Sequence, residues 1–215
     1  MSPALRSLLL ALLIAVAVAA LRSAAQPPEG LAAAPGFAIP TVGSRAQPIS
    51  FDGVAPGDQQ AVLAAVAGAR PDARRLLDAV AGLVTVRVGP AGDGAAGSTQ
   101  PTRTGYDVVL DLGLVSQSLG PRGVERLVLH ELGHVVDFAL VPDATLATLD
   151  AGVPRGYGCE QGRLGACADP EERFAESFAK WAADDIGVNL PVGYKVPPPA
   201  LGLATWAAPL TQLAG

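Results

Sequence analysis

His130 and His134 are the only histidines in this 215-residue chain, and they stand four positions apart with Glu131 between them. On a helix, residues four apart lie one turn from each other on the same face, so both imidazoles can reach a single ion. Imidazole is a favoured ligand of Zn²⁺. Glu131 is turned by about 100° from His130 around such a helix, which places its carboxylate beside an ion-bound water rather than on the ion. The pattern H-E-x-x-H therefore predicts a zinc site with Glu131 as general base.

A histidine pair with this spacing also arises by chance on a solvated helix face. In this chain apolar residues surround the pair, with Leu127 and Val128 before it and Val135 and Val136 after it. Partial burial is therefore expected, and two buried imidazoles without an ion would lack polar partners. The surroundings favour the metal site over the solvated pair.

The third ligand is expected to be a carboxylate, because the chain has no further histidine and its two cysteines are expected to form a disulfide. Asp137 lies one turn beyond His134, too close along the helix to complete a tetrahedron easily. It is better placed to orient an imidazole from behind, and a solvated surface aspartate is an equal alternative.

A later segment offers two carboxylates with the same spacing. Glu172 and Glu176 stand four positions apart, so on a helix they share one face. One of them can bind the ion while the other accepts a hydrogen bond from a ligating histidine. Glu172 also has a local alternative, since it lies three residues after Asp169 and occupies the capping-box position. A different face carries the aromatic residues expected to dock this helix into the core, Phe174, Phe178 and Trp181.

Periodicity, glycines and prolines predict the elements that must position these residues. The expected elements are helices over residues 57–69 and 71–82, a strand over residues 84–88, a surface loop over residues 91–102 and a half-buried strand over residues 106–112. Pro121 is expected to begin the helix that carries the histidine pair, and Pro142 to stop it. Asp169 and Pro170 are expected to begin the helix with the two glutamates.

Composition limits the class of protein. Half of the residues are hydrophobic and the formal net charge is −5, which supports a packed core and argues against nucleic-acid binding. Arg6, the apolar run at residues 8–21 and the small residues that follow are typical of a secretory signal peptide at residues 1–25. An uncleaved membrane anchor is the alternative, and only that alternative would bring the chain to a membrane. Cys159 and Cys167 would lie in an oxidising compartment, where a disulfide is expected.

The segments H-E-L-G-H-x-x-D and E-x-F-A-E-S-F-A, at residues 130–137 and 172–179, resemble the zincin metallopeptidases of the Glu-ligand (gluzincin) type. They are most similar to the catalytic domain of anthrax lethal factor and its relatives. The resemblance implies an α+β zincin-like domain, in which a small mixed sheet packs on the active-site helix and a later helix carries the third zinc ligand. It implies that Glu172 binds Zn²⁺, that Glu176 supports the site, and that Tyr157 faces the ion and stabilises the oxyanion. By analogy with zincins, the strand at residues 106–112 would form the edge of the substrate cleft.

These expectations combine into one hypothesis: a secreted or cell-envelope endopeptidase with one Zn²⁺ per chain, acting on peptide or protein substrates. The domain is expected at residues 51–190, after a Pro/Ala/Gly-rich linker at residues 26–50 and before a tail of unassigned structure at residues 191–215. Two alternatives remain open, a zinc-stabilised binding module without catalysis and a hydrolase of a non-protein amide in the cell envelope. Glu131 argues against the first, because a structural zinc site needs no general base.

Overall fold

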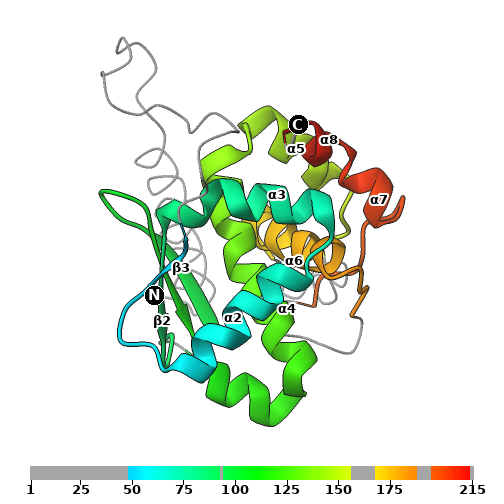
Figure 1. The fold of residues 1–215 in the computed structure, drawn as a ribbon. Helices are drawn as coiled ribbons and strands as arrows, with labels where there is room; N and C mark the ends of the chain where they lie inside the picture. The colour runs from blue at the N-terminus through cyan, green and yellow to red at the C-terminus, as the bar shows by residue number, and fades with distance from the viewer. Residues whose placement is uncertain (1–47, 93, 156–167, 188–194, 214–215) are drawn as a thin grey trace, which may run out of the picture. The chain divides into compact units, whose positions relative to one another are not determined.

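The computed structural model describes residues 48–92, 94–155, 168–187 and 195–213 (Figure 1). The predicted signal peptide, nearly all of the predicted linker, and the predicted site residues Tyr157, Cys159 and Cys167 lie outside the described residues. All described residues belong to one unit of the chain, residues 42–215. Among its described helices, none combines the length and the apolar composition that crossing a membrane requires.

Strands and helices alternate in the first half of the described chain, and helices follow in the second half. In chain order the elements are β1 (Ser50–Phe51), α2 (Pro56–Gly68), α3 (Pro71–Val80), the 3₁₀ helix η1 (Ala81–Leu83), β2 (Val84–Val88), β3 (Gly97–Pro101), β4 (Tyr106–Leu110), α4 (Leu112–Leu140), α5 (Asp143–Ala151), α6 (Pro170–Ala182), α7 (Leu203–Trp206) and α8 (Ala208–Leu213). The helices predicted at residues 57–69 and 71–82 correspond to α2 and α3, and the strand predicted at residues 84–88 is β2. A proline stands in the first turn of both helices, where its missing N–H leaves no bond unmade.

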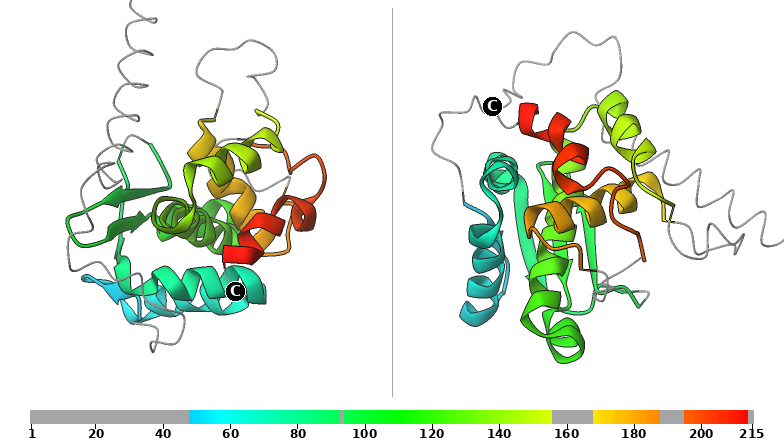
Figure 2. Two further views of the ribbon diagram at one scale, coloured as in Figure 1. Left: turned by 90° about the horizontal axis from the view of Figure 1, so that it is seen from above. Right: turned by 90° about the vertical axis from the view of Figure 1, so that its right-hand side faces the viewer.

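The four strands form a mixed sheet in the order β1–β2–β4–β3. β1, β2 and β4 run parallel, and β3 runs antiparallel to β4. Val86 and Val108 pair within the sheet, and both are fully buried. The sheet packs on α4, which confirms the predicted α+β fold with a small mixed sheet against the helix of the histidine pair (Figure 2).

Two predictions about the sheet are wrong. The loop predicted over residues 91–102 contains strand β3, whose sequence Gly-Ser-Thr-Gln-Pro has little intrinsic preference for a strand. Pairing with β4 supplies the backbone hydrogen bonds that this sequence does not signal. The strand expected at the cleft edge, β4, lies inside the sheet between β2 and β3, so β3 takes the edge.

Helix α4 contains a break at Gly120, where φ is +65° and ψ is −163°. The predicted start at Pro121 therefore matches the second segment of α4. The first segment was not predicted; Asp111 caps it by accepting a hydrogen bond of 2.9 Å from the backbone N–H of Leu114. Every residue from 126 to 137 is buried, because α4 passes between the sheet on one side and α6 on the other (Figure 2).

Helix α6 begins at Pro170, as predicted, and its aromatic residues Phe174, Phe178 and Trp181 are all buried. The C-terminal tail, whose structure the sequence left unassigned, forms α7, which packs on α6, and α8, which packs on α3. The ring of Trp206 lies 5.9 Å from that of Phe174, and its indole N–H donates to the carbonyl of Leu149 in α5. The tail therefore packs on α6 through the contact between Trp206 and Phe174.

Candidate metal centre

Three donor groups from two helices meet between α4 and α6. They are His130 and His134 of α4 and Glu172 of α6, and their donor atoms all lie within 4.8 Å of one another. The two histidines are 6% and 7% exposed, whereas the carboxylate of Glu172 is partly open to solvent. The structure thus brings together the three residues that the sequence predicted to meet.

The spacing of these donors fits a metal ion better than a set of hydrogen bonds. Donor atoms about 2.0–2.1 Å from a tetrahedral zinc ion lie about 3.3–3.4 Å apart. Nε2 of His130 is 3.3 Å from Oε2 of Glu172, and Nε2 of His134 is 3.5 Å from Oε1 of the same carboxylate. A charge-assisted N–H···O bond would be about 2.7–2.9 Å long. The group could therefore hold a metal ion.

The capping-box alternative for Glu172 is not what the structure adopts. Asp169 stands at the N-cap of α6, but its side chain makes no capping hydrogen bond. Glu172 lies instead against both imidazoles. Arg173 anchors the same end of the helix, because its guanidinium donates to both carboxylate oxygens of Asp150, at 2.6 and 2.7 Å. This two-bond contact fixes the start of α6 against α5 and thereby the place of Glu172.

Burial and neighbouring charges shift the pKa values of the two imidazoles in opposite directions. Burial lowers the pKa of His130, but contact with the carboxylates of Glu172 and Glu176 outweighs burial and raises that pKa to about 10. Burial and the nearby charge of His130 lower the pKa of His134 to about 4. Burial raises the pKa of Glu172, but contact with the imidazoles outweighs it and lowers the pKa to about 2. In the metal-free protein one proton on His130 therefore balances the charge of Glu172.

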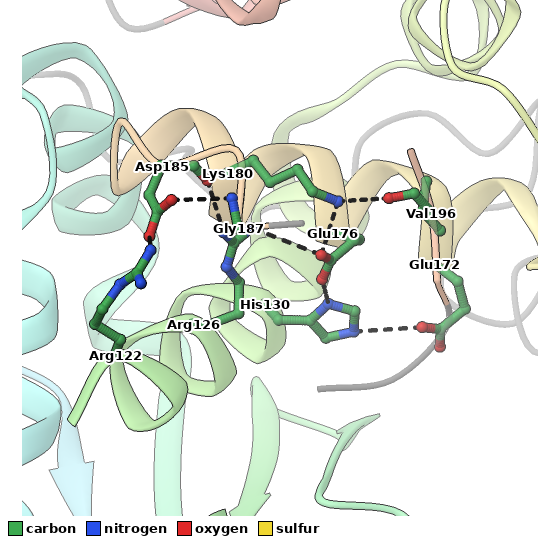
Figure 3. A network of polar contacts seen from close by, with 9 residues as sticks. All are labelled: Arg122, Arg126, His130, Glu172, Glu176, Lys180, Asp185, Gly187 and Val196. Atoms are coloured by element: carbon green, nitrogen blue, oxygen red, sulfur yellow. Dashed lines mark hydrogen bonds and ion pairs between the residues drawn. The ribbon is translucent and has the colours of Figure 1, made fainter. Parts of the chain in front are cut away.

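Glu176 faces Nδ1 of His130, whereas Glu172 faces Nε2 on the other side of the ring (Figure 3). Its Oε2 is 3.4 Å from Nδ1 of His130, and both atoms are buried without a hydrogen-bond partner within the usual limits. Glu176 therefore contacts one of the predicted ligands, and its supporting role stays a prediction. Asp137 is buried on α4. The burial of Tyr106 raises the pKa of that tyrosine, and the charge of Asp137 raises it further. The contact of Asp137 with an imidazole stays a prediction.

Glu131 lies on the β3 side of α4 and is buried. Oγ1 of Thr99 is 2.8 Å from Oε2 of this carboxylate and 2.9 Å from the main-chain oxygen of the same residue. A Cβ atom on Gly97 would lie 2.5 Å from Oε1, so a larger residue there would force the Glu131 carboxylate to move. Burial raises the pKa of Glu131, and the charge of His130 and the Thr99 contact partly oppose that rise. A buried carboxylate with a raised pKa is a better proton acceptor.

Three residues at the site escaped the sequence analysis: Thr99, Arg126 and Lys180. Thr99 was missed because strand β3 was predicted as a loop. Arg126 and Lys180 both contact Glu176, and both carried a signal in their spacing. Arg126 stands four residues before His130, and Lys180 stands four residues after Glu176, so each shares a helix face with a predicted site residue.

Comparisons of the chain with protein-family models, with curated proteins and with solved structures find no match. The predicted Tyr157, Cys159 and Cys167 lie outside the described residues, so their roles stay predictions. What the structure itself establishes is an α+β fold in which a buried His–His–Glu group, consistent with a zincin-like site, could hold a metal ion.

Proposed function

We propose that this chain is an exported zinc-dependent endopeptidase of the Glu-ligand zincin type. The observation that carries the proposal is the convergence of His130, His134 and Glu172 within 4.8 Å, with the buried carboxylate of Glu131 on the same helix turn. The proposal of export to a secreted or cell-envelope location is supported by the apolar run at residues 8–21 and the small residues after it.

The donor set suits one Zn²⁺ per chain. Two imidazoles and one carboxylate are a common ligand set of catalytic zinc, whereas structural zinc sites usually take four protein ligands. Among the described residues the group offers three. A bound zinc ion would supply Lewis-acid chemistry and lower the pKa of a coordinated water to about 7.

Glu131 is the residue proposed to move the proton. Thr99 holds Oε2 of Glu131, which leaves Oε1 to accept a proton from the attacking water. The same carboxylate then returns this proton to the leaving amine nitrogen. Tyr157 is proposed to face the ion and stabilise the oxyanion.

Strand β3 is proposed to bind the substrate backbone. It is one of the two edge strands of the sheet, and among the described strands only β4 pairs with it. An extended peptide can add to such an edge through main-chain hydrogen bonds. Because Thr99 of β3 also contacts Glu131, a peptide on this edge would lie close to the proton acceptor.

The test begins with the metal content of the purified mature chain, where about one zinc per chain is expected. Glu131→Gln should abolish hydrolysis of a peptide library and leave the zinc content unchanged. A variant that cleaves as fast as the parent would show that Glu131 is not the general base. A parent chain that holds zinc but cleaves no peptide would favour the binding module or a non-protein amide, which cell-wall fragments offered as substrates would separate.

A further inference from the structure

Six polar residues, spaced one helical turn apart, line the contact between α4 and α6. They are Arg126, His130 and His134 of α4 and Glu172, Glu176 and Lys180 of α6. His134 meets Glu172 at one end of this row, and Arg126 meets Glu176 toward the other, so the two helices run antiparallel. The three candidate metal ligands, His130, His134 and Glu172, occupy one half of the row. The other half, formed by Arg126, Glu176 and Lys180, has no part in the proposed reaction.

The two carboxylate oxygens of Glu176 have different partners (Figure 3). Both cations contact Oε1, with Nζ of Lys180 at 2.8 Å and Nη1 of Arg126 at 3.6 Å. Oε2 faces Nδ1 of His130 at 3.4 Å. Arg126 is only 1% exposed and Lys180 only 2%, so these contacts are formed out of water. The cations thus occupy one oxygen and leave the other to the imidazole.

Each cation is also fixed by a backbone carbonyl from a segment that follows α6. Lys180 donates to the carbonyl of Val196 at 2.7 Å, and Arg126 donates to the carbonyl of Asp185 at 2.6 Å. A Cβ atom on Gly187 would lie 1.9 Å from Nη2 of Arg126, so the backbone at this glycine closes directly over the guanidinium. Long cationic side chains normally have many rotamers. Here the end of each side chain is held on two sides, by Glu176 and by a backbone carbonyl.

We propose that Arg126 and Lys180 are positioning residues for the metal centre: they hold Oε1 of Glu176 so that Oε2 stays aimed at Nδ1 of His130. That contact keeps the Nδ1 proton on the ring and turns Nε2 toward Glu172, as a zinc-binding imidazole requires. The inference rests on the proposed metal centre, but not on the proposed peptidase activity. A purely structural role is the alternative, because removing one partner of a buried ion pair can destabilise the fold by leaving the other charge unpaired.

The test is a double-mutant cycle on zinc affinity, measured by competition with a chromophoric chelator. Glu176→Gln and Lys180→Met should each weaken zinc binding by about 10- to 100-fold, as loss of a partner behind a metal ligand usually does. If Lys180 acts through Glu176, the double variant should bind zinc about as weakly as Glu176→Gln alone. Additive losses, or unchanged affinity in folded Lys180→Met, would overturn the proposal.

A second variant perturbs the cluster formed by Arg126, Glu176 and Lys180 without removing a charge, in case Lys180→Met does not fold. Gly187→Ala places a methyl group against Arg126 and should weaken zinc binding by up to about tenfold. Val62→Ala is the stability control, because Val62 is a buried residue of α2 outside the cluster and should lower stability without changing zinc affinity. If Gly187→Ala binds zinc like the parent while remaining folded by circular dichroism, the positioning role is wrong.

These outcomes are distinct from a failure of the proposed function. A parent chain that binds zinc, loses affinity in the cluster variants and hydrolyses no peptide would support the positioning role and contradict the peptidase. A parent chain that binds no zinc would overturn both.

Discussion

Oγ1 of Thr99 lies 2.8 Å from Oε2 of Glu131, so the edge strand of the sheet holds the carboxylate proposed as general base. The same hydroxyl is 2.9 Å from the main-chain oxygen of Glu131, but its single proton can serve only one acceptor at a time. When the proton points to the carboxylate, it fixes Oε2 and leaves Oε1, which lies beside Gly97, without this hydrogen bond. The rotamer of Glu131 is therefore set by a residue 32 positions earlier in the chain.

Thr99→Val should lower kcat/KM by about 10- to 100-fold, the usual worth of a hydrogen bond to a charged group, without releasing zinc. Valine keeps the shape of threonine and removes only the hydroxyl. Peptide hydrolysis and zinc content would be measured on the same preparation. Thr99→Ser keeps the hydroxyl and should retain most of the activity. Full activity in the valine variant would show that Thr99 does not hold the base.

Glu172→Ala should release zinc, because it removes one of three donors and no other described group completes the set. Atomic absorption after dialysis would report the loss. Glu171→Ala is the matched control, since it removes the adjacent carboxylate, which is not one of the three donors, and should keep zinc bound. If Glu176→Ala releases zinc and Glu172→Ala does not, the ligand and its supporting residue have been exchanged.

Zinc binding near pH 7.5 should release about one proton per ion from the protein's own side chains, because a ligating imidazole must lose its Nε2 proton. Protons are released rather than taken up because of the pKa shifts of the two histidines. The pKa of His130 is raised to about 10, so this ring is protonated in the metal-free protein and must give up a proton. The pKa of His134 is lowered to about 4, so that ring is already neutral. Release from His130 should therefore be nearly constant from pH 6 to 9 and decline as the pH rises through about 10. A zinc-bound water with a pKa of about 7 would add to the proton count as the pH rises above 6.

Calorimetric titrations in two buffers with different heats of ionisation would count these protons. Binding heats that do not depend on the buffer at pH 7.5 would show that His130 is neutral before the ion arrives.

Trp206→Ala should lower the free energy of unfolding by about 3–5 kcal/mol, because it removes a large buried side chain and leaves a cavity against Phe174. The loss of the hydrogen bond to Leu149 adds to this effect. Leu201→Ala is the control from the same tail. That side chain is 77% exposed, so its removal should change stability by less than about 0.5 kcal/mol. Urea denaturation would compare the two, and equal stabilities would show that the tail is not part of the folded unit.

The residues that share one face of a helix, and the residues at which helices begin, could be predicted from the sequence. His130 and His134 share a helix face because of the helical period, and the same period places Glu172 and Glu176 on one face of α6. Prolines at residues 71, 121 and 170 mark helix starts because a proline at that position leaves no hydrogen bond unmade. These features depend on neighbours within about one turn of chain, so no tertiary contact is needed to specify them.

Contacts between distant segments decided the rest. Strand β3 has no strand-forming sequence and exists because β4 pairs with it, and that pairing brings Thr99 to Glu131. The choice between a capping role and a metal-facing role for Glu172 depended on how α6 packs against α4. The division of the Glu176 oxygens between two cations and one imidazole depended on the same packing of α6 against α4. Burial and hydrogen bonding across helices set these preferences, and no local spacing encodes them, because the partners become neighbours only when the chain has folded.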